Sequence, residues 1–149
     1  MNWNITYALL AAGAGACIAM QASANGAFRR NLGDHWWAAF FSICGTFITA
    51  VVAMIVLRPN TPTAEAVRST QWWNWIGGPL GAMIVLAGAA LTPRLGAAAF
   101  IAFVVGGQLL CSVLLDHFAM LGLPQQSITP GRVLGALLVV AGVLCIKYL

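Results

Sequence analysis

The 149-residue chain is 61% hydrophobic and only 7% charged, with a formal net charge of +4 at pH 7. Soluble domains carry roughly 25% charged residues, so this sequence lacks the polar side chains that a water-exposed surface needs. Its seven basic residues are scattered between apolar segments, whereas a nucleic-acid-binding protein gathers them in a patch. The composition therefore excludes a soluble domain and a nucleic-acid partner. It predicts an all-α integral membrane protein that is embedded in the lipid bilayer.

Polar residues divide the chain into five apolar segments, each close to the length of about 20 residues that a membrane-spanning helix needs. The first segment ends at Asn25-Gly26, and the second ends before Arg58-Pro59, where charge and proline together stop a membrane helix. We expect a single transmembrane domain over residues 1–149, a polytopic bundle with helices over residues 5–24, 36–57, 73–91, 95–117 and 133–148.

The first segment also has a small-residue pattern, Ala22-Ser23-Ala24, that is similar to a signal-peptide cleavage site. The basic residues that precede the apolar part of a signal peptide are absent here, and Gln21 would interrupt that part. We therefore expect the segment to remain as the first membrane span.

The four cysteines lie in four different apolar segments, at Cys17, Cys44, Cys111 and Cys145. Cysteines placed in this way do not form the paired loop positions of a disulfide framework or a zinc site. We expect no metal, no cofactor and no enzyme activity.

The basic residues are nearly balanced between the two membrane faces that five spans define. One face receives Arg58, Arg68 and Arg132, and the other receives Arg29, Arg30, Arg94 and Lys147. Under the positive-inside rule, either one loop dominates the orientation and the count is uninformative, or copies insert in both directions. In the second case two copies would pair as an antiparallel, dual-topology homodimer, a ten-helix inverted repeat like those of many secondary transporters.

Polar side chains within the spans are the first candidates for a substrate site, because a polar group at membrane depth is costly. Gln21 and Asn25 are four residues apart, about 40° around a helix, so both can face one cavity, or they can join helices by hydrogen bonds. Gln108, Ser112 and Asp116 form a similar stripe on the fourth helix.

Asp116 and His117 are the only acid and imidazole expected near membrane depth, at the far end of the fourth span. A histidine beside a carboxylate titrates near neutral pH, which suits proton coupling. Their place at the helix end favours a structural or gating role instead.

Weaker candidates complete the set. Thr46 adds a hydroxyl to the expected substrate pocket, although such hydroxyls often bond back to their own helix. Trp75 flanks a span, where tryptophan belts are the usual explanation and a cage for a cation is the alternative. Small residues allow close helix approach, so we expect dimer packing at Gly131, Gly135 and Gly142.

Several motifs together resemble one known family over essentially the whole chain. They are Gln21-x-x-x-Asn25, Trp72-Trp73-x-Trp75-x-Gly77-Gly78, Pro93-Arg94-Leu95-Gly96-Ala97, and Gly107-Gln108-Leu109 with Ser112 and Asp116-His117-Phe118. The sequence resembles the short, five-helix YdcZ-type branch of the drug/metabolite transporter superfamily. That branch often has glycine after Asp-His-Phe, where this chain has Ala119. The membrane-embedded glutamate of the more distant small multidrug transporters has no counterpart in the first helix.

The resemblance implies a multi-pass protein of the inner (cytoplasmic) membrane that exports a small molecule. We predict a secondary transporter for a small organic molecule, neutral or weakly cationic, that works by alternating access in an inverted-repeat dimer. The alternatives are a small dual-topology channel and a non-transporting assembly subunit, and a homologous sister chain could replace the second copy in the dimer.

Overall fold

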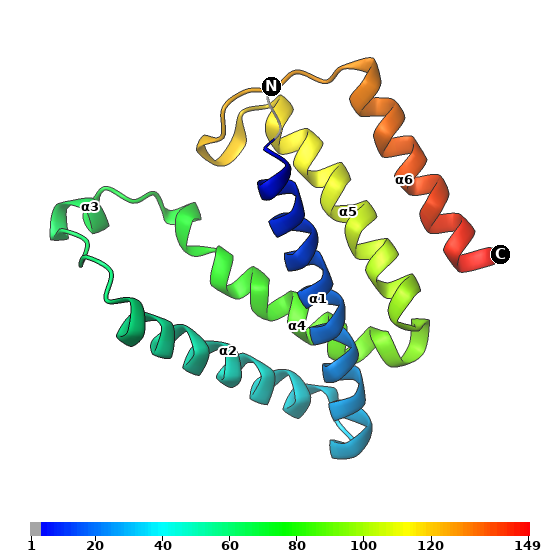
Figure 1. Ribbon diagram of the computed structural model, residues 1–149, viewed down its shortest axis with the longest axis horizontal. Helices are drawn as coiled ribbons and strands as arrows, with labels where there is room; N and C mark the ends of the chain where they lie inside the picture. The colour runs from blue at the N-terminus through cyan, green and yellow to red at the C-terminus, as the bar shows by residue number, and fades with distance from the viewer. Residues whose placement is uncertain (1–3) are drawn as a thin grey trace. The chain divides into compact units, whose positions relative to one another are not determined.

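A computed structural model describes residues 4–149 as an all-helical chain (Figure 1). Five segments are long and apolar enough to cross a membrane, as the sequence predicted. The spanning helices are α1 (Ile5–Leu32), α2 (His35–Leu57), α4 (Gly77–Leu95), α5 (Ala97–His117) and α6 (Pro130–Tyr148). The connections contain the short helices α3 (Ala64–Arg68), η1 (Trp72–Trp75) and η2 (Met120–Gly122).

Local sequence explains where most of these helices begin. The side chains of Asn4, Asp34 and Thr129 accept hydrogen bonds from the backbone two or three residues ahead, and thereby cap α1, α2 and α6. Proline is the first residue of α6, which begins at Pro130 rather than at the expected residue 133. A proline fits there because the first backbone N–H of a helix has no partner within the helix.

The expected end of the first helix at Ala24 is wrong, because α1 continues to Leu32 and stops at Gly33, whose φ is 73°. Asn25 and Gly26 are buried within the helix instead of ending it. A Cβ at Gly26 would lie only 3.3 Å from the side chains of Thr92 and Pro93. Packing against α4 therefore keeps the chain helical where the local sequence favours a break.

The expected bounds of the third span also shift. Residues Trp72–Trp75 form the separate 3-10 turn η1, and α4 runs from Gly77 to Leu95 rather than from 73 to 91. Pro93 lies inside the last turn of α4. The α5 helix starts at Ala97, two residues after the end of α4, because Gly96 adopts a φ of 83° between them.

The chain divides into two compact units, one ending at Arg94 and the other beginning at Leu95. In the first unit α1 and α2 form a hairpin, and Phe28 stacks near Phe41 with ring centroids 5.9 Å apart. A small core of Ala38, Ala39 and Ala89 joins α2 to α4. These alanines allow close approach at one end of the two helices, and α2 and α4 diverge from there (Figure 1).

The second unit is an antiparallel pair formed by α5 and α6 (Figure 1). Gly106 of α5 is buried opposite Val143 of α6, and a Cβ on the glycine would lie 3.4 Å from the valine side chain. The single domain expected over residues 1–149 stays a prediction.

Candidate functional site

A cavity of about 510 Å³ lies in the first unit, where α2 and α4 diverge beside α1. Most of its lining is apolar, and glycines of α4 leave room on one wall. The lining residues are Ile18, Gln21, Ile43, Thr46, Phe47, Ala50, Gly77, Gly78, Gly81, Ala82, Ile84 and Val85. The cavity has the size and the mainly apolar character of a small-molecule site.

Two of the predicted site residues, Gln21 and Thr46, meet at this cavity although they come from different helices. The Thr46 hydroxyl donates to the Ser42 carbonyl at 3.1 Å, so it offers a ligand only its oxygen as an acceptor. Gln21 is exposed, and within residues 4–149 its amide has no hydrogen-bond partner, so it offers both donors and an acceptor. Uncharged polar groups on an apolar wall can orient a ligand without an ionic bond.

Asn25 does not line this cavity, although it lies one helical turn from Gln21. Its side chain is only 5% exposed, and its Nδ2 has no hydrogen-bond partner among the described residues. The buried Thr92 hydroxyl on α4 is in the same condition. The structure therefore places Asn25 in the helix packing of the first unit.

Trp75 also lies outside the cavity lining. Its indole is 64% exposed, and its Nε1 donates to the Thr70 hydroxyl at 3.1 Å. The adjacent Gly77 and Gly78 reach the cavity instead. The sequence motif that contains this glycine pair did not indicate a cavity wall, because that position depends on how α4 packs.

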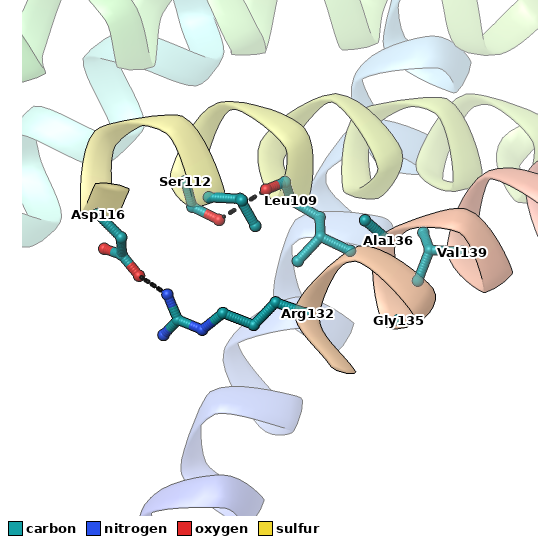
Figure 2. A pocket seen from close by; sticks show the side chains of 8 residues that line it. Leu109, Ser112, Asp116, Arg132, Gly135, Ala136 and Val139 are labelled. Atoms are coloured by element: carbon teal, nitrogen blue, oxygen red, sulfur yellow. Dashed lines mark hydrogen bonds and ion pairs between the residues drawn. The ribbon is translucent and has the colours of Figure 1, made fainter. Parts of the chain in front are cut away.

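A groove of about 360 Å³ lies in the second unit between α5 and α6. It is lined by Leu109, Ser112, Val113, Asp116, Arg132, Gly135, Ala136 and Val139. Asp116 and Arg132 point toward one another from the two helices (Figure 2), with 3.4 Å between Oδ2 and Nη1. The predicted residues Ser112 and Asp116 thus share a groove, whereas Gln108 is exposed and does not line it.

The connection from α5 to α6 folds back onto the end of α5. The Gln126 backbone N–H donates to the Asp116 carbonyl at 2.8 Å, and Gln125 Nε2 donates to the His117 carbonyl at 3.1 Å. Arg132 in turn donates to the Gln126 carbonyl at 3.3 Å and to its side-chain oxygen. The bonds to the Asp116 and His117 carbonyls satisfy groups that the end of a helix leaves without partners.

Asp116 and His117 therefore have different partners despite being adjacent. Asp116 faces Arg132, whereas the Ile128 backbone N–H lies 3.4 Å from His117 Nδ1 and donates to it. Within residues 4–149 no hydrogen bond links the Asp116 side chain to the His117 side chain.

The sequence reasoning missed Arg132 and Gln126 as members of this cluster. One signal was available, because Arg132 lies in the first turn of α6, where the helix dipole disfavours a cation. A cation in that position implies an anionic partner nearby. Asp116 is the acid available, since the other two acids, Asp34 and Glu65, lie at the starts of α2 and α3.

Two of the glycines predicted for dimer packing line the seam between α5 and α6. Gly135 belongs to the groove with the ion pair, and Gly142 belongs to a second groove of about 280 Å³. Gly131 lies in the first turn of α6, and no atom comes within 4 Å of a Cβ built at any of the three. Their role in a dimer stays a prediction.

Comparison with known proteins identifies a family for the chain. Residues 6–145 match the family described as "Putative inner membrane exporter, YdcZ". The chain is also 38% identical over 78 residues to "Inner membrane protein YdcZ" of Escherichia coli (strain K12). That match covers 52% of each protein, so the chain spans about half the length of this curated relative. No solved structure matches the chain significantly. The five candidate spans and the family match agree on an inner-membrane protein, and the chain belongs to the YdcZ family.

Proposed function

We propose that this protein is a secondary transporter that exports a small organic molecule, neutral or weakly cationic, through the cavity of its first unit. The observation that carries the proposal is the 510 Å³ cavity with Gln21 and Thr46 on an apolar wall. No charged side chain lines it, so a strongly anionic substrate would lack a counter-charge there. An amide and a hydroxyl oxygen can instead hold an uncharged or weakly basic group.

The shape of the first unit supports alternating access. The helices α2 and α4 meet at Ala38, Ala39 and Ala89 and separate toward the cavity. The cavity end of α4 begins with Gly77-Gly78-Pro79, a sequence that favours a bend or hinge. Rocking of α4 about its alanine contact would open and close the cavity on one side.

A second, inverted copy would complete the transporter in this proposal. Five spans are an odd number, and the basic residues are nearly balanced between the two faces. An antiparallel dimer converts such a chain into a ten-helix inverted repeat, with access from both sides. Within the dimer we assign Asp116 and His117 a gating role, because Asp116 pairs with Arg132 at the start of α6 and His117 accepts from Ile128 in the connection before it.

Blocking the cavity tests the transport proposal. Purified protein would first be screened by thermal shift against metabolites and quaternary amines, and any stabilising compound would be followed as flux in liposomes. Gly81→Leu places a side chain in the cavity, where no atom lies within 4 Å of the new Cβ. Gly15→Leu is the matched control, since Gly15 is equally open but does not line the cavity.

We expect Gly81→Leu to abolish both the thermal shift and the flux, and Gly15→Leu to retain both. Equal flux in the two variants would contradict a substrate path through this cavity. Single-channel currents in planar bilayers would favour the alternative of a channel, and an absence of flux for every stabilising compound would favour an assembly subunit. If Asp116→Asn removes only the response of the flux to a pH gradient, Asp116 takes part in proton coupling rather than in gating.

Cysteine labelling tests the dual topology. Ser69 lies just after α3 and Gln125 lies in the connection before α6, and both are exposed. Ser69→Cys and Gln125→Cys should each label partly from either side of intact cells with a membrane-impermeant maleimide. Complete labelling from a single side would exclude the antiparallel homodimer and favour a heterodimer with a sister chain.

A further inference from the structure

The seam between α5 and α6 carries a groove along most of its length. Two grooves, of about 360 and 280 Å³, share Val139, and their α5 residues lie at positions 98, 101, 102, 105, 109, 112, 113 and 116. Such spacing follows one face of a helix, and 18 residues of α-helix extend about 27 Å. The grooves therefore follow one face of the pair over a length close to the hydrocarbon thickness of a bilayer, about 30 Å.

The groove is charged at one end and apolar elsewhere. Asp116 and Arg132 line that end, and each side chain is 30% exposed. Beyond them the wall consists of aliphatic side chains and glycine, apart from the Ser112 hydroxyl, which donates to the Leu109 carbonyl at 2.9 Å (Figure 2). This is the polarity of an amphiphile, a charged head followed by an apolar chain.

The ion pair leaves binding capacity on both partners. Arg132 has five N–H donors, and two of them donate to Gln126. Its contact with Asp116 at 3.4 Å is a single ionic approach and not a bidentate pair. Nη1 faces both the Gln126 carbonyl and Asp116, and one N–H of Nη2 donates to Gln126. Within residues 4–149 the Nε–H and the second N–H of Nη2 therefore remain for a planar or tetrahedral oxyanion such as phosphate.

The two helix ends add a matching field. The α5 helix ends at His117, so its negative dipole end lies beside Asp116. The α6 helix starts at Pro130, so its positive end lies beside Arg132. A ligand with a cation on the Asp116 side and an anion on the Arg132 side would match both the charges and the dipoles.

From this geometry we propose that the α5/α6 groove binds a phospholipid with a zwitterionic, primary-ammonium headgroup. The phosphate lies on the free donors of Arg132, the ammonium lies on Asp116, and an acyl chain follows the apolar groove past Gly135 and Val139. Because Asp116 lies in the last turn of a spanning helix and Arg132 in the first turn of the next, the charged end falls at headgroup depth. A primary ammonium donates hydrogen bonds to a carboxylate, which a quaternary choline group cannot do.

A second copy of the chain is the competing occupant, because Gly135 and Gly142 can also receive a helix. Val143 of α6 packs against Gly106 of α5 and also lines the apolar part of the groove. The space between the two helices is therefore narrower than a helix with its side chains, which is about 10–12 Å wide. An inserted helix would also cover the partly exposed ion pair at the end of the groove. An acyl chain is narrower, and its headgroup supplies partners for both charges.

Lipid retention on the purified full-length protein tests the proposal. Protein in detergent would be titrated with palmitoyl-oleoyl phosphatidylethanolamine, phosphatidylcholine or phosphatidylglycerol, and retained lipid would be counted by native mass spectrometry. The variants are Arg132→Gln and Asp116→Asn for the headgroup and Gly135→Phe for the groove. Arg68→Gln is the control, because Arg68 is an exposed arginine of α3 that does not line the groove.

We expect the wild type to retain phosphatidylethanolamine in preference to the other two lipids. Arg132→Gln should weaken retention about tenfold or more, as expected for the loss of charge-assisted hydrogen bonds. Asp116→Asn should bring phosphatidylethanolamine down to the level of phosphatidylcholine, Gly135→Phe should reduce retention of all three lipids, and Arg68→Gln should match the wild type.

Three results would overturn the proposal. The first is equal retention of phosphatidylglycerol and phosphatidylethanolamine by the wild type, and the second is an Arg132→Gln effect no larger than that of Arg68→Gln. The third is that Gly135→Phe separates a dimer but leaves lipid retention unchanged, which would assign the groove to a second copy. If Arg132→Gln fails to fold, Gly135→Phe still tests lipid binding in the groove. This variant is expected to fold, because no atom lies within 4 Å of a Cβ at Gly135.

Discussion

Adding a side chain at Gly26 should force α1 away from α4. A Cβ at this position would lie 3.3 Å from Pro93 Cδ and Cγ and from Thr92 Cβ. The proline ring is rigid and Thr92 is only 7% exposed, so neither can move aside without shifting a helix. Gly26→Leu therefore introduces an overlap that the first unit has to accommodate by separating two helices.

The magnitude follows from the cost of overpacking, which is typically about 1–3 kcal/mol. Gly13→Leu is a matched control on the same helix, because no atom lies within 4 Å of a Cβ at Gly13. A substitution at such an open position usually changes stability by about 0.5 kcal/mol or less. Both substitutions exchange glycine for leucine within α1, so the difference between them isolates the contact with α4.

Unfolding in mixed micelles with increasing dodecyl sulfate, followed by tryptophan fluorescence, would measure this difference. We expect Gly26→Leu to be less stable than Gly13→Leu by about 1–3 kcal/mol, and Gly26→Ala to lie between them. If the two leucine variants unfold at the same detergent fraction, α1 and α4 do not touch at Pro93 and the reasoning fails.

Two further predictions concern stability in the same assay. Arg29 donates from Nη1 to the Ala90 carbonyl at 2.6 Å, so Arg29→Gln should cost about 1.5–3 kcal/mol. Arg30→Gln, at an exposed site, should lower the free energy of unfolding by less than about 0.5 kcal/mol. If both variants lose a similar amount of stability, the Arg29 bond does not contribute to it. Ala119 has a φ of 49°, a left-handed conformation that costs an L-residue about 1–2 kcal/mol. Because glycine also loses more backbone entropy on folding, Ala119→Gly should raise the free energy of unfolding by at most about 1 kcal/mol. A less stable variant would show that Ala119 is not strained.

The strain at Ala119 gives a physical reason for the glycine from which this chain departs. The family resemblance points to glycine after Asp-His-Phe, and the structure places that position in the left-handed region. Glycine adopts this conformation without steric cost. The sequence alone showed the departure, but the backbone angle explains why a glycine suits the site.

The candidate site was predictable only in part. Gln21 and Thr46 were identified as polar residues inside spans, and both line the cavity. Asn25 satisfied the same criterion but is buried in helix packing. The two amides of α1 are only about 40° apart around the helix, so their separation depends on where neighbouring helices lie. Periodicity within one helix does not contain that information.

The sequence alone established the number of spans, the all-helical class and the family. The spans and the class follow from the length of the apolar segments and from the capping residues around them, which are local properties of the chain. Only the tertiary structure decided that α1 continues through Asn25-Gly26 and that Arg132 reaches Asp116 across a connection folded back on α5. Both depend on contacts between residues far apart in the chain. In a bilayer the lipid solvates nearly every apolar face equally well, so hydropathy locates the spans, and the fit of small and polar side chains selects which faces meet.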